Sequence, residues 1–258
     1  MKNLPLVARQ NKIRERFAEQ PGATISELAR EFGVSEMTIR RDLDALERQS
    51  HVQRTHGGAI LTERMILEFD YRDRRAANRA AKRAIAAEAR KLVLPGQRII
   101  LDNGTTTLEL ASLLQDGENL TVITPSLAVA SELQHAAGVE VILLGGTLRR
   151  GSPDLTGPVT EHCLELFAAD IVFQGADGIG LDGKIYNSDM RLARVDKLMR
   201  RMAGRSYVLA DHGKIGVTAL ACSGALANVT GFITSAGAPA AVMSRLAKTG
   251  AKIITVNP

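Results

Sequence analysis

From residue 96 to its end, the chain repeats one pattern, in which a short continuous apolar run is followed by a stretch with helical periodicity. Strands buried on both faces read as continuous apolar runs, whereas half-exposed strands alternate apolar and polar residues. The repetition therefore predicts a mainly parallel α/β sheet covered by helices. The expected strands are 98–102, 120–124, 139–145, 171–176, 206–211, 231–234 and 252–256, and the expected helices are 107–114, 127–134, 160–167, 189–203 and 240–248.

The first 61 residues read differently, as three helices in close succession. The first is expected over about 6–20 and ends at a Pro-Gly pair. Thr24 and Glu27 have the spacing of a capping box at the start of the second helix. Gly33 then makes a tight turn, and Ser35 is a good N-cap for the third helix. The order helix, short glycine-containing turn, helix is typical of a helix-turn-helix unit.

A short hairpin and a charged segment follow the third helix. Val52 and Ile60 flank a His-Gly-Gly turn, which predicts a hairpin or "wing". The segment 62–75 is charged and irregular, and a basic, alanine-rich helix is expected over 76–93. We therefore expect a winged helix-turn-helix domain at 1–61, a linker at 62–75 and an α/β domain at 76–258.

The charge of the chain is concentrated at its N-terminal end. Up to residue 90 there are 18 basic and 13 acidic residues, whereas 15 of each follow, so the net charge of +5 belongs to the first third. Such asymmetry favours an acidic polymer as partner of the N-terminal part. The first residues do not resemble a secretory signal, and we expect a cytoplasmic protein. Cys163 and Cys222 are too few for a disulfide framework or a cysteine-based metal site, and we interpret both as buried structural thiols.

The third helix presents two different faces when residues 35–49 are placed about 100° apart. Ile39, Leu43 and Leu46 cluster on one side, which is expected to pack on the first two helices. The exposed side begins with Ser35 and carries Met37, Thr38, Arg40 and Arg41. A methionine for a thymine methyl, a hydroxyl for a phosphate and two guanidinium groups for guanine or phosphate are what a recognition helix offers to a major groove.

Two other interpretations of these residues remain open. Arg40 and Arg41 can pair with Glu36, Asp42 or Asp44 on a solvated helix, where each pair contributes a few tenths of a kcal/mol. Arg54 and His56 on the hairpin can contact the adjacent DNA backbone or minor groove, or can belong to an ordinary solvated turn.

Polar or glycine residues follow several of the predicted strands, and in an α/β sheet such strand ends meet in one crevice. The first turn has a glycine, three threonine hydroxyls and a helix N-terminus, which together suit an anion. Taken alone, it can equally be a simple helix cap. The candidate ligand-binding residues are Asp102, Gly104, Thr105, Thr106, Thr107, Ser126, Gly145, Gly146, Asp177, Gly178, Asp211 and Lys214.

This crevice suits a phosphorylated sugar or polyol, with Lys214 and the threonine turn for the phosphate and Asp102, Asp177 and Asp211 for the hydroxyls. Alternatively, Lys214 merely pairs with Asp211, and Asp177 caps a turn. No P-loop lysine follows the threonine turn, and G178-I-G180 lacks the full dinucleotide fingerprint, so ATP and NAD are poor candidates. We expect no cofactor and no metal.

The run V34-S-E-M-T-I-R-R-D-L-D-A-L-E47, followed by H56-G-G58, resembles the winged helix-turn-helix of the DeoR family of bacterial sugar-metabolism repressors, over about residues 6–61. The segments Y71-x-x-R74-x-x-x-N78-x-x-x-K82-x-x-I85-A86, D102-x-G-T-T-T, L144-G-G-T-L-R149, F173-Q-G-A-D-G-I179 and D211-x-x-K214 resemble the C-terminal sensor domain of the same family. Pro125, His212-Gly213 and Ser235 depart from its usual pattern.

The resemblance implies a repressor of a carbohydrate operon that binds double-stranded operator DNA, assembles as a dimer or tetramer, and is relieved by a sugar-phosphate effector. It also implies a sensor domain similar in fold to ribose-5-phosphate isomerase and glucosamine-6-phosphate deaminase. The three departures leave the identity of the effector open. A second hypothesis is a sugar-phosphate isomerase or deaminase with an accessory DNA-binding domain, in which Asp102, Asp177, His212 and Lys214 do acid-base work. We expect a regulator, not an enzyme.

Overall fold

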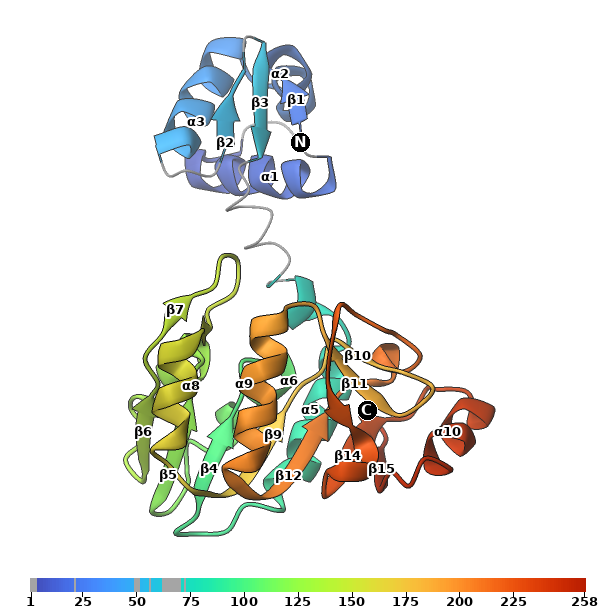
Figure 1. Ribbon diagram of the computed structural model, residues 1–258. Helices are drawn as coiled ribbons and strands as arrows, with labels where there is room; N and C mark the ends of the chain where they lie inside the picture. Colours follow the sequence, from blue (N-terminus) through green and yellow to red (C-terminus); the bar gives the residue numbers. More distant parts are fainter. Residues whose placement is uncertain (1–3, 21, 49–51, 56, 62–70, 72) are drawn as a thin grey trace. The chain divides into compact units, whose positions relative to one another are not determined.

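A computed structural model describes residues 4–20, 22–48, 52–55, 57–61, 71 and 73–258. The chain forms two compact units, and the main division between them falls at Arg74 and Arg75 (Figure 1). Within the described ranges, no helix is long and apolar enough to cross a membrane.

The N-terminal unit contains the three helices and the hairpin that its sequence predicts. Its helices are α1 Leu6–Glu19, α2 Ile25–Phe32 and α3 Glu36–Arg48, and its strands are β1 Gly22–Thr24, β2 Val52–Arg54 and β3 Gly58–Leu61. The capping box is present, because Thr24 Oγ1 accepts from Glu27 N and a Glu27 carboxylate oxygen accepts from Thr24 N. Gly33 ends α2 in the left-handed conformation, at φ 65°.

Strand β1 is an addition to the predicted wing, since the sequence marks this segment only as the end of a helix. The three strands pair antiparallel in the order β1-β3-β2. Gly58 makes this pairing possible, because a Cβ at residue 58 would lie 2.0 Å from the carbonyl oxygen of Ala23. The second glycine of the His-Gly-Gly turn is therefore required by the close approach of two backbones.

The core of this unit is the predicted inner face of α3 packed on α1 and α2. Ile39, Leu43 and Leu46 are completely buried, together with Phe17 of α1 and Leu28 of α2. Burial of side chains of this size contributes about 1.5–3 kcal/mol each, so apolar packing sets the orientation of α3. The prediction of which side of α3 faces inward is confirmed.

A buried ion pair also holds α1 against α3. Asp42 is completely buried, and its two carboxylate oxygens accept from Arg9 Nε at 2.6 Å and Arg9 Nη2 at 3.2 Å. Gln10 Nε2 is 3.5 Å from the same carboxylate, and Arg9 Nη1 also donates to the carbonyl oxygen of Leu4. The bidentate geometry and the additional donors offset the desolvation of both charges.

The C-terminal unit is built on a seven-stranded parallel sheet, as predicted. Its order is β15-β14-β12-β9-β4-β5-β6. The strands are β4 Arg98–Leu101, β5 Leu120–Thr124, β6 Val139–Leu143, β9 Ala169–Gln174, β12 Ala203–Leu209, β14 Gly231–Ser235 and β15 Ile253–Val256. The helices are α5 Arg79–Arg90, α6 Thr105–Ser112, α7 Leu127–Leu133, α8 Pro158–Glu165, α9 Met190–Arg201 and α10 Ala240–Ala247.

Helices cover both faces of this sheet, and for this reason the strands read as continuous apolar runs. Ile99 and Ile171 belong to the core that contains α5, α6 and α7, whereas Ile100 and Val172 belong to the core beneath α8 and α9. Figure 1 shows α8 and α9 on one side of the sheet and α5 and α6 on the other. Successive side chains of one strand thus enter opposite cores.

The chain reverses its direction across the sheet between β4 and β9. From β4 the next strands, β5 and β6, are added towards one edge, whereas β9, β12, β14 and β15 are added towards the other. The carboxyl ends of β4 and β9 therefore form the topological switch point, where α/β sheets open a crevice for ligands. The threonine turn follows β4 directly, so the sheet order places it at this point.

Two sequence expectations for this unit are wrong, and one sheet was not expected at all. The helix expected over 76–93 begins only at Arg79, because Asn78 adopts a left-handed conformation at φ 50°. A small antiparallel sheet, β10-β11-β13, was not predicted; its strands are Gly178–Ile179, Lys184–Asn187 and Ala221–Ala225. Cys222 lies on β13 and is exposed, and Cys163 is partly buried, so neither is the fully buried thiol expected.

A further two-stranded hairpin consists of β7 Thr147–Leu148 and β8 Leu155–Thr156.

Candidate functional site

The outer face of α3 carries the side chains predicted for DNA. Met37, Arg40 and Arg41 are exposed, with 60% of Met37 accessible to solvent, and Thr38 is partly buried. Ser35 precedes the helix and fixes its first turn, because its Oγ accepts from Thr38 N at 3.2 Å and lies 2.9 Å from Thr38 Oγ1. An apolar side chain and two guanidinium groups are therefore presented at the start of a rigid helix.

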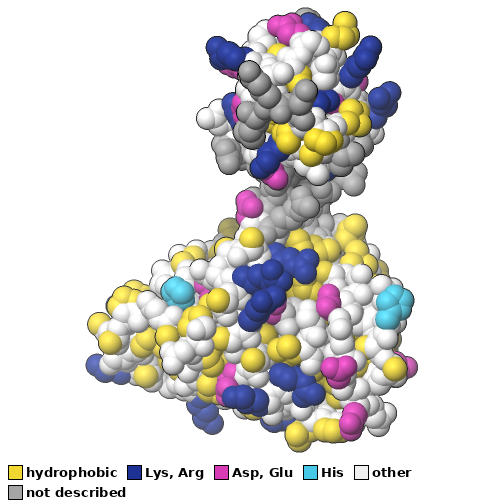
Figure 2. Space-filling model, turned by 180° about the vertical axis from the view of Figure 1, so that it is seen from behind, with side chains coloured by type: hydrophobic (Ala, Val, Ile, Leu, Met, Phe, Trp, Pro, Cys, Tyr) yellow, Lys and Arg dark blue, Asp and Glu magenta, His cyan; other side chains and the backbone are white. Residues whose placement is uncertain are grey.

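The three acidic residues that could have formed ion pairs with Arg40 and Arg41 have other partners. Asp42 holds Arg9, Asp44 holds Arg54, and Glu36 Oε1 accepts from Ser26 Oγ at 2.6 Å. Among the described residues, neither Arg40 nor Arg41 makes an ion pair. Figure 2 shows Lys and Arg side chains projecting from several sides of this unit. Both guanidinium groups are thus available to phosphate or bases.

Arg54 of the wing points at α3. Its guanidinium forms an ion pair with Asp44, and its backbone N donates to Glu47 Oε1 at 3.0 Å. The DNA contact expected for Arg54 stays a prediction from the sequence, as do the contacts expected for the α3 residues. His56 lies outside the described residues.

In the C-terminal unit, Asp102 organises the turn after β4. Its carboxylate accepts from Gly104 N at 2.8 Å, from Thr107 Oγ1 at 2.6 Å and from Gly175 N, and it is almost completely buried. Burial raises the pKa of the Asp102 carboxyl, although the three hydrogen bonds lower it. Because these donors all belong to its own turn or to the end of β9, Asp102 ties the two strand ends of the switch point together.

The N-terminus of α6 lies at this point. Gly104 is the N-cap and provides no side-chain hydrogen bond to the helix. Thr105 is partly buried, Thr106 is buried, and Thr107 Oγ1 is bound to Asp102. A helix N-terminus whose amides are uncapped by a side chain, with a partial positive charge, suits an anion.

Three other residues predicted for the ligand site lie after β5 and β6, where they cap a helix or allow a loop to pack closely. Ser126 is buried and caps α7, since its Oγ accepts from Val129 N at 3.3 Å. The carbonyl oxygen of Gly145 accepts from Thr160 Oγ1 at 2.8 Å. At Gly146, a Cβ would lie 1.9 Å from Thr160 Oγ1, so the glycine pair lets this loop pack directly on α8.

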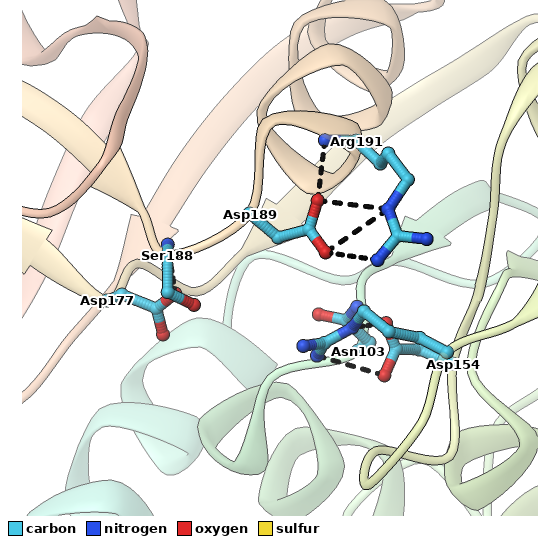
Figure 3. Close-up of polar contacts among 7 residues, drawn as sticks. Asn103, Asp154, Asp177, Ser188, Asp189 and Arg191 are labelled. Atoms are coloured by element: carbon cyan, nitrogen blue, oxygen red, sulfur yellow. Dashed lines mark hydrogen bonds and ion pairs between the residues drawn. The ribbon is translucent and has the colours of Figure 1, made fainter.

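Asp177 follows β9 and binds Ser188, which lies between β11 and α9. Its Oδ2 accepts from Ser188 N and Ser188 Oγ, each at 2.7 Å (Figure 3). Its Oδ1 has no hydrogen-bond partner among the described residues. Gly178 is buried, and a Cβ at this position would lie 2.4 Å from the carbonyl oxygen of Val217. The close approach of the two backbones therefore requires a glycine here. Asp177 therefore has both a structural bond and an oxygen left for a ligand.

Asp211 and Lys214 follow β12 but do not pair with each other through their side chains. Asp211 Oδ1 accepts from Asn78 Nδ2 at 2.7 Å and from Gly213 N at 3.0 Å, and its Oδ2 has no partner among the described residues. Lys214 is partly buried, and its ammonium makes no ion pair with any residue that the structure describes. This cation remains available to a phosphate.

Two of the departures from the DeoR pattern contact each other beside Lys214. His212 Nδ1 lies 2.9 Å from Ser235 Oγ, and His212 N donates to the same oxygen at 3.1 Å. Ser235 is buried at the end of β14. The two departures are therefore coupled by direct hydrogen bonds.

The sequence prediction missed a second group of charged residues near the switch point. Asp154, at the hairpin β7–β8, is completely buried and accepts from Arg149 Nε at 2.8 Å and Asn103 Nδ2 at 2.7 Å. At the start of α9, Asp189 pairs with Arg191 at 2.6 Å (Figure 3). The Arg191 guanidinium lowers the pKa of the Asp189 carboxyl. Arg149 stands in the quoted L144-G-G-T-L-R149 motif, whereas the α9 pair carries no motif that marks it.

Beneath these groups, Asp196 is a buried acid whose titration gives a testable prediction. Its carboxylate accepts from Asn187 Nδ2 at 2.9 Å, and burial, with a smaller contribution from the Asp102 charge, raises its pKa to about 7. The folded protein then retains a proton between about pH 4 and pH 7 that the unfolded chain releases. Stability from this group is therefore present at low pH and is lost as the pH rises to about 7.

Asp196→Asn should remove this pH dependence. We expect the variant to gain stability over wild type as the pH rises, with a gain in the free energy of unfolding about 1–3 kcal/mol larger at pH 8 than at pH 5. Urea unfolding of both proteins at the two pH values measures the effect. Equal pH dependence in the two proteins would show that Asp196 is charged in the folded state.

No group of three or more His, Cys, Asp or Glu side chains suited to a metal occurs in the described part of the chain. An exposed recognition-type helix in a winged unit, joined in one chain to a doubly wound α/β domain, is typical of DNA-binding transcriptional regulators with a sensor domain. Residues 9–65 match the DeoR-like helix-turn-helix domain, and residues 77–236 match the DeoR C-terminal sensor domain. The chain belongs to the DeoR family.

Relatives along nearly the whole length are named as regulators. The HTH-type transcriptional regulator GolR of Listeria innocua is 35% identical, covering 88% of this chain and 89% of that protein. The transcriptional repressor AccR of Agrobacterium fabrum is 31% identical, covering 96% and 97%. The glycerol-3-phosphate regulon repressor of Escherichia coli K12 is 31% identical, covering 92% and 94%. Ribose 5-phosphate isomerase A of Methanocaldococcus jannaschii is similar at a TM-score of 0.41 and 20% identity, covering 54% and 55%.

Proposed function

We propose that this chain is a cytoplasmic repressor of a carbohydrate-utilisation operon, and that a phosphorylated sugar or polyol bound at the β4–β9 switch point releases it from operator DNA. The observation that supports the ligand proposal is the group of polar atoms that follow the carboxyl ends of β4, β9 and β12. They are the uncapped first turn of α6, the ammonium of Lys214 and one oxygen each of Asp177 and Asp211. The names of the relatives support repression.

These atoms divide into two kinds, as a sugar phosphate requires. The α6 amides and Lys214 carry positive charge for a phosphate, whereas the free carboxylate oxygens accept hydrogen bonds from hydroxyls. Asp102 is better assigned to shaping the turn, because its three donors are internal. This assignment also weakens the isomerase or deaminase alternative, in which Asp102 was one of the acid-base candidates.

Release follows from linkage between the two units. We propose an oligomer, dimer or tetramer, whose paired α3 helices match two operator half-sites only in the ligand-free arrangement. A coupling free energy of about 1–3 kcal/mol changes operator affinity roughly 5- to 150-fold.

The test is release of a fluorescent operator, selected from random DNA with the full-length protein, by a panel of phosphorylated sugars and polyols. We expect one member to release wild-type protein, and Lys214→Ala to require at least roughly tenfold more ligand while binding operator normally without it. Lys197→Ala, which removes an exposed lysine of α9, is the control and should respond like wild type. Response of the Lys214 variant at wild-type concentrations would contradict the assignment.

A further inference from the structure

The wing and the recognition helix are joined by two polar contacts of one residue. The Arg54 guanidinium pairs with Asp44, and Arg54 N donates to Glu47 Oε1 at 3.0 Å. Both acidic residues lie in the second half of α3, so strand β2 is bound along the helix that carries Arg40 and Arg41. Arg54 is thus placed to influence DNA binding without touching DNA.

The contact between Arg54 and Asp44 matters for DNA binding because of the position of Asp44. It lies on the exposed side of α3, three and four residues after Arg41 and Arg40, and 53% of its side chain is accessible. A bare carboxylate here would face the phosphates that the neighbouring arginines attract. Two unit charges about 4 Å apart interact by about 1 kcal/mol in water and by more near a protein surface, so the repulsion would be felt.

The Arg54 side chain is less exposed to solvent than those of Arg40 and Arg41. Only 23% of its side chain is accessible, and its Nε is buried with no hydrogen-bond partner among the described residues. A phosphate-binding arginine offers a two-pronged fork to solvent, as the exposed Arg40 and Arg41 can. The geometry of Arg54 differs from this, because its charge is directed onto Asp44.

We propose that Arg54 is a positioning residue, which neutralises Asp44 and holds the wing on α3, and is not itself a phosphate contact. The inference rests on the DNA binding in the proposed function. It predicts that the damage caused by losing Arg54 is repaired by removing the Asp44 charge. A phosphate contact, by contrast, cannot be restored by a change at Asp44.

The experiment is a double-mutant cycle in the full-length protein on the selected operator duplex. Arg54→Gln should weaken binding roughly 5- to 20-fold, because it exposes the carboxylate. Asp44→Asn should stay within about threefold of wild type, and Arg54→Gln/Asp44→Asn should return to within about threefold. Arg54→Lys, which retains the charge, should also bind within about threefold. Thermal unfolding of each variant verifies that it is folded.

The matched control is Arg40→Gln with and without Asp44→Asn. Arg40 has no ion-pair partner among the described residues, so Asp44→Asn should not restore the binding lost at Arg40. Salt titration gives a second readout: the Arg54→Gln/Asp44→Asn protein should keep the wild-type slope of log K against log salt, whereas Arg40→Gln should reduce it by about 0.9.

A double variant that remains as weak as Arg54→Gln, with a slope reduced by about 0.9, would make Arg54 a phosphate contact and overturn the inference. Failure of wild-type protein to select any duplex would instead remove the proposed function on which the inference rests.

Discussion

Replacement of Asp42 by alanine is expected to destabilise the N-terminal unit by about 3–5 kcal/mol, which is the usual effect of breaking a buried ion pair. The substitution leaves the Arg9 guanidinium buried without its bidentate acceptor and removes the link between α1 and α3. A unit of this size has only a few kcal/mol of stability, so most of it should be unfolded at 25 °C. Calorimetry of the full chain should lose the transition of the winged unit and keep that of the sheet domain.

Asp44→Ala is the matched control, because Asp44 is the same residue type on the same helix, two positions after Asp42, but is exposed to solvent. Loss of an exposed ion pair changes stability by about 0–1 kcal/mol, and the N-terminal transition should remain. Similar stability losses for the two variants would mean that the Asp42 pair is solvated in the folded protein. Apolar packing alone would then hold α1 against α3.

Arg40→Ala and Arg41→Ala should each weaken operator binding by about 1–3 kcal/mol, which is a loss of roughly 5- to 150-fold. Both guanidinium groups are exposed and have no ion-pair partner among the described residues, so their contacts with DNA replace only water. A residue that contacts phosphate should reduce the salt slope by about one and affect all sequences alike. A residue that contacts a base should relax the sequence preference at one position.

The stability of both arginine variants should stay within about 0.5 kcal/mol of wild type, since neither side chain is part of the core. Arg98→Ala, which removes the same charge from the C-terminal unit, should leave operator binding unchanged. Unfolding of the Arg41 variant, or an equal loss of affinity in the Arg98 variant, would contradict the assignment of α3 as the recognition helix.

Much of the fold could be predicted because the residues that determine it act locally or periodically. The side chains at Ile39, Leu43 and Leu46 repeat with the helical period, and this repetition places Arg40 and Arg41 outside. The apolar runs of the sheet are continuous because both faces are covered, and all seven runs form strands. A capping box at Thr24 and Glu27 depends on residues only three apart.

The errors concern contacts between distant residues. Strand β1 forms because β3 provides a partner, and the paired residues of β11 and β13 are 34 to 41 positions apart, which no local pattern reveals. Asn78 interrupts the predicted basic helix, and its amide reaches Asp211, 133 positions away. Arg9 and Asp42 are likewise 33 positions apart. Such pairs become visible only when the fold brings them together.

The same distinction applies to the candidate site. Strand-end reasoning located the turn after β4 and the ends of β9 and β12, because parallel strands necessarily gather their carboxyl ends. It could not divide the carboxylates by role. Asp102 is engaged on three sides, whereas Asp177 and Asp211 each have an oxygen without a partner among the described residues. The pairing of Asp154 escaped prediction because its partner Asn103 lies 51 positions away in the sequence.

The most direct test of the account is a measurement of reciprocity between the two units. Isothermal titration of the releasing sugar phosphate into free protein and into the protein–operator complex gives its affinity in the two states. Linkage requires the ligand to bind the free protein more tightly than the complex, by the same factor of roughly 5 to 150 by which it weakens operator binding. Equal affinities in the two titrations would contradict the claim that a ligand at the β4–β9 switch point controls the DNA-binding helix.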